Sequence, residues 1–264
     1  MFKKKGFIMA FILIISMIGM TACKKNVGAP EDNAQAEENE DETNTEETQE
    51  HLIGFSVIDM ENPYFITLES AAKAELEEDG YRMITKNPET DPQLQETQIQ
   101  EMIDEGIEAI ILSPVDWEKI TPSLQALKKA GVKIINVDTQ VKEMEYVDAY
   151  IGSDNQKAGY ICGEDLITKC PDGGKIAILE CPTQNSINDR ITGFEEAIAQ
   201  AENGFEVVER MDTKGEFELA LEAAQKILEE HPDISAIMCG NDQLAVAAKA
   251  AVNVAELDLS LIHI

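Results

Sequence analysis

The fold is decided by residues 107–137, which read IEAIILSPVDWEKITPSLQALKKAGVKIINV. The apolar run at 107–112 is typical of a buried strand, and Ser113-Pro114 ends it. Residues 118–130 have the periodicity of an amphipathic helix, which Gly131 stops. A second apolar run follows at 132–137. The stretch therefore predicts a strand–helix–strand unit with two parallel strands.

The same alternation continues on both sides of this unit and restarts near residue 157. The other strands that we expect are 52–57, 81–84, 146–151, 175–179, 205–210 and 235–238. The other helices that we expect are 64–79, 93–105, 157–169, 189–201, 217–230 and 243–252. This order predicts an α/β fold made of two doubly wound parallel-sheet lobes with a hinge between them.

We assign residues 51–153 to an N-terminal lobe and residues 154–258 to a C-terminal lobe that is incomplete. The hinge is expected at Ser153, Asp154 and Asn155. In open parallel sheets, ligands bind beyond the carboxyl ends of the strands. The stretches that follow the strands in this way are 56–65, 113–117, 138–140, 181–190 and 240–242.

Composition excludes several classes of function. The chain has 264 residues with 51 acidic and 21 basic side chains, which give a formal net charge of −30. Such a surface repels phosphate backbones, so we expect no nucleic-acid partner. Three histidines and the absence of a CxxC motif leave little material for a metal site, and we expect neither a metal nor a cofactor.

The N-terminus has the pattern of an export signal. Three lysines at positions 3–5 precede an apolar run at 6–20, which is short for a spanning helix. We interpret residues 1–22 as a signal peptide, with a transmembrane anchor as the alternative. Met20-Thr-Ala-Cys23 resembles the lipobox of bacterial lipoproteins, although Met20 stands where Leu is usual. The resemblance implies cleavage before Cys23 and lipid attachment there.

Residues 23–50 form the lipidated cysteine and an acidic segment without aromatic residues. Such a segment cannot bury enough surface to fold, and its like charges extend it. We expect a disordered tether that holds the folded part at the outer face of the bacterial cytoplasmic membrane.

Five short stretches carry a family resemblance. They are GFSVIDMENPYF at 54–65, IINVD at 134–138, IGSDN at 151–155, NDRITGF at 188–194 and CGND at 239–242. In order and spacing they resemble ribose-type periplasmic sugar-binding proteins, which have the type I periplasmic-binding-protein fold. The likeness covers residues 52 to about 252.

The resemblance implies a receptor and no enzyme. Members of that family capture a monosaccharide by hinge closure and deliver it to the transmembrane subunits of an ABC permease. We therefore expect a monomer that binds a neutral pentose, hexose or related polyol. The alternatives are a sugar-sensing subunit for a membrane kinase or chemoreceptor, and a secreted glycoside hydrolase.

The resemblance also assigns ligand contacts to individual positions. The residues expected to bind the ligand are Asn62, Tyr64, Phe65, Asp138, Thr139, Arg190 and Asn241. Aromatic faces suit the apolar C–H face of a sugar, and planar multidentate groups suit its hydroxyls. Ser56 and Trp117, at the carboxyl ends of strands, are further candidates, and packing on the surface is the alternative for Trp117.

Two positions depart from the family and leave the identity of the sugar open. Thr139 stands where ribose receptors often have Arg. Gly215 stands where many members stack an aromatic ring, and Phe217 is two residues away from that position.

Four cysteines remain in the folded part, namely Cys162, Cys170, Cys181 and Cys239. An exported protein can form disulfides, and three pairings are available. Cys162 could approach Cys181, but without a close-spaced pattern we favour free, buried thiols.

The tail 259–264 continues neither a helix nor a turn. Back-translated with common codons, it resembles a sequencing-library adapter. We therefore expect these six residues to be non-native and the natural chain to continue.

Overall fold

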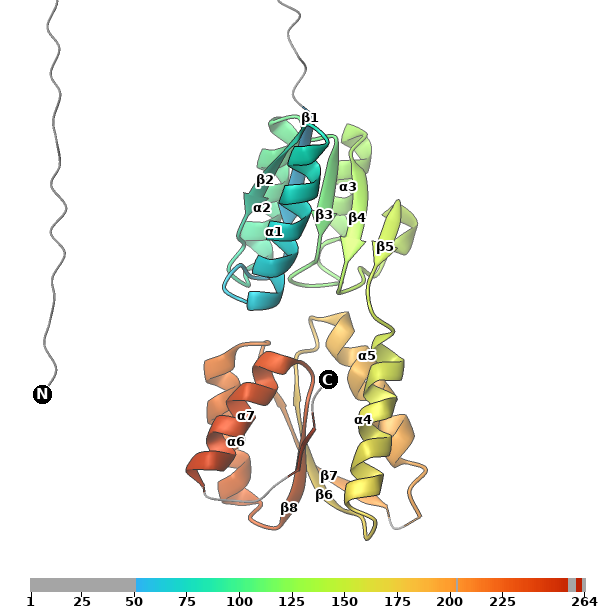
Figure 1. The fold of residues 1–264 in the computed structure, drawn as a ribbon, viewed down its shortest axis with the longest axis vertical. Coiled ribbons are helices and arrows are strands. Elements are labelled where there is room, and N and C mark those ends of the chain that lie inside the picture. Colours follow the sequence, from blue (N-terminus) through green and yellow to red (C-terminus); the bar gives the residue numbers. More distant parts are fainter. Residues whose placement is uncertain (1–50, 203, 256–259, 263–264) are drawn as a thin grey trace, which may run out of the picture. The chain divides into compact units, whose positions relative to one another are not determined.

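Two parallel β-sheets carry the fold in the computed structural model, which describes residues 51–202, 204–255 and 260–262 (Figure 1). The predicted α/β class with parallel sheets is confirmed. The expectations for the signal peptide, the lipidated cysteine and the tether lie outside the described residues. Within the described residues, no helix is long and apolar enough to cross a membrane.

The first sheet has the strand order β2-β1-β3-β4-β5. Its strands are β1 (His51–Ser56), β2 (Tyr81–Lys86), β3 (Ala109–Leu112), β4 (Lys133–Val137) and β5 (Ala149–Ile151). Its helices are α1 (Pro63–Glu78), α2 (Pro92–Asp104) and α3 (Thr121–Ala130), and a 3₁₀ turn, η1 (Met144–Tyr146), precedes β5. The strand expected over 146–151 is thus shortened to Ala149–Ile151, because Tyr146 belongs to that turn and the strand begins only after residue 148.

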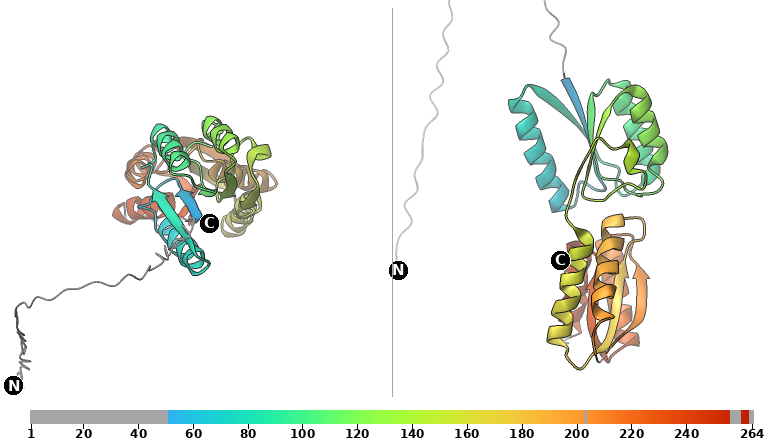
Figure 2. Two further views of the ribbon diagram at one scale, coloured as in Figure 1. Left: turned by 90° about the horizontal axis from the view of Figure 1, so that it is seen from above. Right: turned by 90° about the vertical axis from the view of Figure 1, so that its right-hand side faces the viewer.

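Helices cover both faces of the first sheet (Figure 2). Phe65 of α1 packs with Phe55 and Val57 on one face. On the other face, Met102 of α2 and Leu127 of α3 belong to a separate buried cluster. This double coverage explains why the strands are apolar runs without polar alternation.

The second sheet has the strand order β7-β6-β8-β9. Its strands are β6 (Gly174–Glu180), β7 (Phe205–Asp212), β8 (Ile234–Cys239) and β9 (Ser260–Ile262). Its helices are α4 (Asn155–Lys169), α5 (Asn185–Ile198), α6 (Phe217–Glu230) and α7 (Asp242–Val254). The tail, for which we expected no element, contributes β9, whose backbone pairs with β8.

Helices α4 and α5 cover one face of this sheet, and α6 and α7 cover the other. Helix α5 starts four residues earlier than expected, because Ile187 continues the buried stripe of Ile191 and Phe194. Helices α4 and α5 approach very closely. A Cβ atom at Gly159 would collide with the carbonyl oxygen of Arg190, so this glycine lets α5 lie against α4.

No disulfide joins the four cysteines of the described part of the chain. Cys162, Cys181 and Cys239 are buried, and Cys170 is half-buried. Burial raises the pKa of the Cys239 thiol to about 12, which makes it a poor nucleophile. The preference for reduced, buried thiols is therefore confirmed for these three residues.

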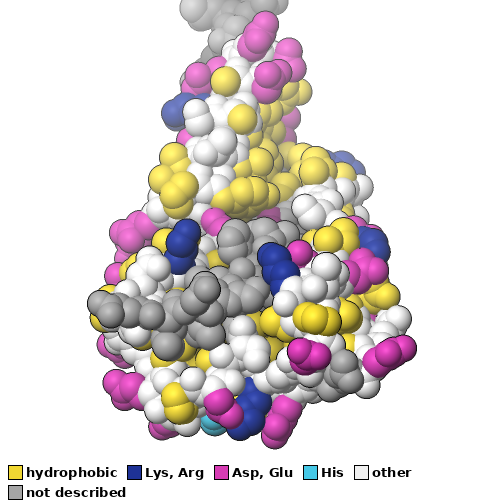
Figure 3. Space-filling model, turned by 60° about the horizontal axis from the view of Figure 1, so that its bottom comes forward, with side chains coloured by type: hydrophobic (Ala, Val, Ile, Leu, Met, Phe, Trp, Pro, Cys, Tyr) yellow, Lys and Arg dark blue, Asp and Glu magenta, His cyan; other side chains and the backbone are white. Residues whose placement is uncertain are grey.

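Acidic side chains are spread over the face of the molecule seen in Figure 3 and do not gather in one patch there.

Candidate ligand-binding pocket

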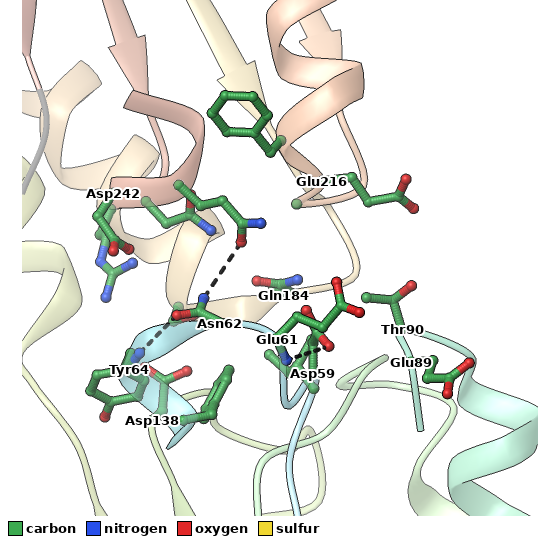
Figure 4. Close-up of a pocket in the computed structure, with 18 of the residues that line it drawn as sticks. Asp59, Glu61, Asn62, Tyr64, Glu89, Thr90, Asp138, Gln184, Glu216 and Asp242 are labelled. Carbon is green, nitrogen blue, oxygen red and sulfur yellow. Dashed lines mark hydrogen bonds between the residues drawn. The ribbon is translucent and has the colours of Figure 1, made fainter. Parts of the chain in front are cut away.

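A cavity of about 370 Å³ lies where loops from the carboxyl ends of strands in both sheets meet. This volume is at the lower end of the range for small-molecule sites, which is about 300–1,000 Å³. Six of the residues that the sequence analysis selected line it, namely Asn62, Tyr64, Phe65, Asp138, Arg190 and Asn241 (Figure 4). They come from four separate segments of the chain.

Asn62 sets the start of helix α1. Its Oδ1 accepts a hydrogen bond of 2.9 Å from the backbone N–H of Tyr64, and Pro63 occupies the first helical turn. Its Nδ2 donates to Oε1 of Gln243 over 3.5 Å. The cap fixes where the next two side chains begin: Tyr64 is half exposed and Phe65 is buried. Their rings meet edge to face, with centroids 5.1 Å apart.

Asp138 follows strand β4 in a left-handed backbone conformation, with φ of 58°. Two bonds hold this backbone: the Asp138 N–H donates to Ile151 O over 3.0 Å, and the Tyr150 hydroxyl donates to Asp138 O over 2.7 Å. Burial raises the pKa of the Asp138 carboxyl, and the positive charge of Arg190 opposes that rise. A rare backbone geometry held in this way is typical of a functional position.

Arg190 extends from helix α5. Its Nη1 donates to the carbonyl oxygen of Gly240 over 3.0 Å. Its buried Nε has no hydrogen-bond partner among the described residues. A buried donor without a partner costs folding free energy, and an acceptor on a ligand would recover it. The guanidinium therefore has a donor available for a ligand.

Asn241 caps helix α7, because its Oδ1 accepts from the backbone N–H of Leu244 over 2.9 Å. The cap uses the oxygen, and the residue lines the cavity, so its amide NH₂ is available as a donor there. Asn62 and Asn241 therefore combine two tasks: each starts a helix and each borders the pocket.

The residues assigned to the hinge connect β5 to α4. Ser153 lines the cavity, whereas Asp154 caps α4 by accepting from Lys157 N over 2.9 Å. Asn155 is buried, and its Oδ1 has no partner among the described residues.

Three sequence candidates do not line the cavity. Ser56 is fully buried, and its Oγ accepts from Gln95 Nε2 over 3.1 Å. The side chain of Thr139 is also fully buried and shares a hydrogen bond of 2.8 Å with Oγ of Ser186.

Trp117 lies outside the cavity lining as well. Its backbone N–H donates to Thr183 O over 3.0 Å, and the ammonium of Lys142 lies 5.9 Å from the centre of its ring. The surface-packing alternative describes this residue better than a ring that faces the ligand.

Sequence reasoning missed several lining residues. Glu89 and Thr90 follow β2, and Glu216 and Glu218 follow β7, at strand ends that the analysis did not consider. Phe217 lines the cavity together with Gly215, so its offset of two residues does not remove it from the pocket. The strand-end rule, applied to every strand, would have found all of these positions.

Comparisons with known proteins agree on one family. The family described as "Periplasmic binding protein domain" matches residues 53–259. The ribose import binding protein of Bacillus subtilis is 26% identical over 252 residues, which are 95% of this chain and 78% of that protein. The D-ribose/D-allose-binding protein of Pseudomonas aeruginosa is 30% identical over 204 residues, which are 74% of this chain and 63% of that protein.

A solved structure gives the same result. An ABC transporter solute-binding protein from Mycobacterium smegmatis with bound glycerol is 30% identical, with a TM-score of 0.73 over 78% of this chain and 72% of that one.

Proposed function

Because the chain belongs to the periplasmic binding protein domain family, we propose that it is an extracytoplasmic receptor for a monosaccharide or a related polyol. The observation that carries the proposal is the convergence of Asn62, Asp138, Arg190 and Asn241, from four segments, on one cavity.

The chemistry of the cavity suits such a ligand. A sugar has a rim of hydroxyl groups, each of which can donate and accept. Asp138 supplies acceptors, Arg190 and the two asparagine amides supply donors, and the rings of Tyr64 and Phe217 border the same space. Hydrogen bonds to the ionised groups are stronger than neutral ones.

The named relatives support the same class of ligand. Two are named for ribose or for ribose and allose, and the solved structure contains glycerol, a small polyol. The proposed contacts in this chain are Asn62, Tyr64, Phe65, Asp138, Arg190 and Asn241.

Ligand capture would bring the two lobes together around the ligand. Loops of both sheets line the cavity, so a bound ligand would contact both lobes, with residues 153–155 as the hinge. A ligand shifts such an equilibrium only by the difference between its affinities for the two states. Capture needs no catalytic step.

Export, lipid attachment at Cys23 and delivery to an ABC permease complete the proposal. Delivery and sensing can be separated in the producing bacterium. Loss of sugar uptake on gene deletion would support delivery, whereas normal uptake with a lost signalling response would support sensing.

Calorimetric titration tests the binding function. The panel is D-ribose, D-allose, D-xylose, D-galactose, D-glucose and myo-inositol. The proposal expects saturable binding of at least one of these sugars and no turnover of it. If no sugar or polyol binds in this panel or in the amine panel described below, the proposal is wrong.

A further inference from the structure

The charges that line the cavity are strongly unbalanced. Seven of its 20 lining residues are Asp or Glu, and Arg190 is the one Lys or Arg among them. In the whole chain, 51 of 264 residues are acidic. The enrichment is therefore greater than the acidity of the chain explains.

The carboxylates divide into two groups. Asp138 and Asp242 lie in the field of Arg190: after burial, which raises the pKa of Asp138, the positive charge of Arg190 lowers that pKa and the negative charge of Asp242 raises it. The remaining five are Asp59, Glu61, Glu89, Glu216 and Glu218, which we call the acidic end. Figure 4 shows Asp59, Glu61, Glu89 and Glu216 on one side of the pocket and Tyr64 and Asp138 on the other.

In the part of the chain that the structure describes, no ion pair neutralises the acidic end. The ion pairs between described residues include none of its five carboxylates, although twelve other carboxylates form such pairs elsewhere. Asp59 accepts the backbone N–H of Glu61 over 2.9 Å, which fixes the loop but neutralises no charge. Carboxylates that border one space without a counter-charge attract a cation into it.

A buried amide points to a ligand at the same place. Gln184 is 8% exposed and lines the cavity, yet its side chain has no hydrogen-bond partner among the described residues. Figure 4 shows it between the Asn62 side of the pocket and the acidic end. Buried amides are normally hydrogen-bonded, so this one is available to a polar group in the cavity.

Gly215 makes room for this amide. It has a φ of 78°, and a Cβ atom at this position would lie 2.8 Å from Nε2 of Gln184. A residue with a side chain here would push the amide aside. The absence of a side chain at Gly215 therefore leaves space for the Gln184 amide at the wall of the pocket.

On the basis of the proposed function, we infer that the ligand is a sugar or polyol that carries a protonated amine. Its hydroxyl groups bind at the Asp138 and Arg190 side and to the Gln184 amide, and its ammonium group lies among the carboxylates of the acidic end. An ammonium has three donors and no acceptor, so it matches a group of carboxylates, which only accept.

Matched pairs of probes test the inference by calorimetry on the full chain at low salt. The pairs are D-glucosamine with D-glucose, D-galactosamine with D-galactose, and 1-amino-1-deoxysorbitol with sorbitol. In at least one pair, the amine should bind ten-fold tighter or more. N-acetyl-D-glucosamine, which lacks the charge, should lose any preference shown by D-glucosamine.

Substitutions then test which residues cause the preference for the amine over the neutral sugar. Glu61→Gln combined with Glu216→Gln should lower the ratio of amine to neutral affinity at least ten-fold, whereas Glu75→Gln, on the exposed face of α1, should leave it unchanged. Gln184→Leu should weaken the amine and its neutral partner alike, because the amide serves hydroxyl groups that both carry. Unfolding midpoints of each variant establish that the fold is kept.

The possible results separate this inference from the proposed function. Neutral sugars that bind as tightly as their amines, or tighter, overturn the inference and leave the receptor function intact. Neutral binding that requires Ca²⁺ and is lost with EDTA also overturns it, because the acidic end would then hold a metal. If no member of any pair or of the earlier panel binds, the receptor function itself fails.

Discussion

The guanidinium of Arg190 is tied to the carbonyl oxygen of Gly240, with 3.0 Å between Nη1 and that oxygen. The bond links helix α5 to the residue just before Asn241, so two proposed ligand contacts are held in register before any ligand arrives. Binding then loses less conformational entropy than it would with mobile side chains.

Arg190→Ala should weaken sugar binding by about 1.5–3 kcal/mol, or about 10- to 150-fold, because it removes a charged hydrogen-bond donor. Calorimetry with the tightest-binding sugar measures the change. Arg210→Ala is the matched control, since Arg210 pairs with Glu180 and Glu195 outside the cavity. Equal affinities for both variants would remove Arg190 from the site.

Asp138→Asn should change the dependence of stability on pH. Burial raises the pKa of Asp138, so above the ordinary Asp value of about 3.9 the folded state binds more protons at this group than the unfolded state. Its contribution to stability therefore falls as pH rises through the interval between the two pKa values. Asparagine cannot ionise, and it tolerates the left-handed backbone.

Urea unfolding at pH 3.5 and pH 7 measures this effect. The free energy of unfolding of Asp138→Asn minus that of the parent chain should be larger at pH 7 than at pH 3.5, so the variant is relatively more stable at pH 7. Asp172→Asn, which removes an exposed carboxylate, controls for the loss of one negative charge. A difference that stays constant with pH, or that changes in the opposite direction, would contradict the burial of this carboxyl.

Gly215→Ala should reduce both stability and binding. A left-handed residue with a Cβ atom costs about 1–2 kcal/mol, and here the new atom also displaces the Gln184 amide. Gly131→Ala is the matched control, because Gly131 has a φ of 81° with nothing within 4 Å of the added atom. It should lose similar stability and keep its affinity, as shown by unfolding and by calorimetry. If the two variants bind equally well, Gln184 has no part in recognition.

Asn62 allows its capping and its binding roles to be separated. Asn62→Ala removes the cap of α1 and should cost about 1 kcal/mol of stability in addition to affinity. Asn62→Asp keeps the acceptor for Tyr64 N but loses the donor to Gln243, so it should keep most of the stability and still bind more weakly. Thermal unfolding combined with calorimetry distinguishes the two, and normal affinity in Asn62→Asp would argue against a contact through Nδ2.

The sequence predicted most elements because local signals and buried runs agree. Gly131 ends its helix in the left-handed conformation, as expected, and the apolar runs at 107–112 and 132–137 contain the strands β3 and β4. The cavity was harder to predict. Asp138 and Thr139 are neighbours in the chain, but only Asp138 lines the cavity. After the left-handed backbone at Asp138, the side chain of Thr139 is buried and shares a hydrogen bond with Ser186. Contacts of that kind depend on a neighbouring element and leave no local pattern.

The acidic end could not be predicted from the sequence either. Glu89 and Glu216 stand in charged loops that look like ordinary solvated surface in the sequence. Only the parallel arrangement of β2, β1, β6 and β7 brings their loops to one cavity. The availability of Gln184 likewise depends on a glycine 31 positions later in the chain.

Side-chain amide signals in an NMR titration test the central claim most directly. D-ribose, D-allose and D-glucosamine are added in turn to ¹⁵N-labelled protein, and the amide groups of Asn62, Gln184 and Asn241 are followed. For the sugar that binds, all three should shift with one dissociation constant, while Asn136, buried between Leu112 and Thr139, should stay in place. Saturable binding that leaves these three signals unmoved would show that the ligand occupies another site.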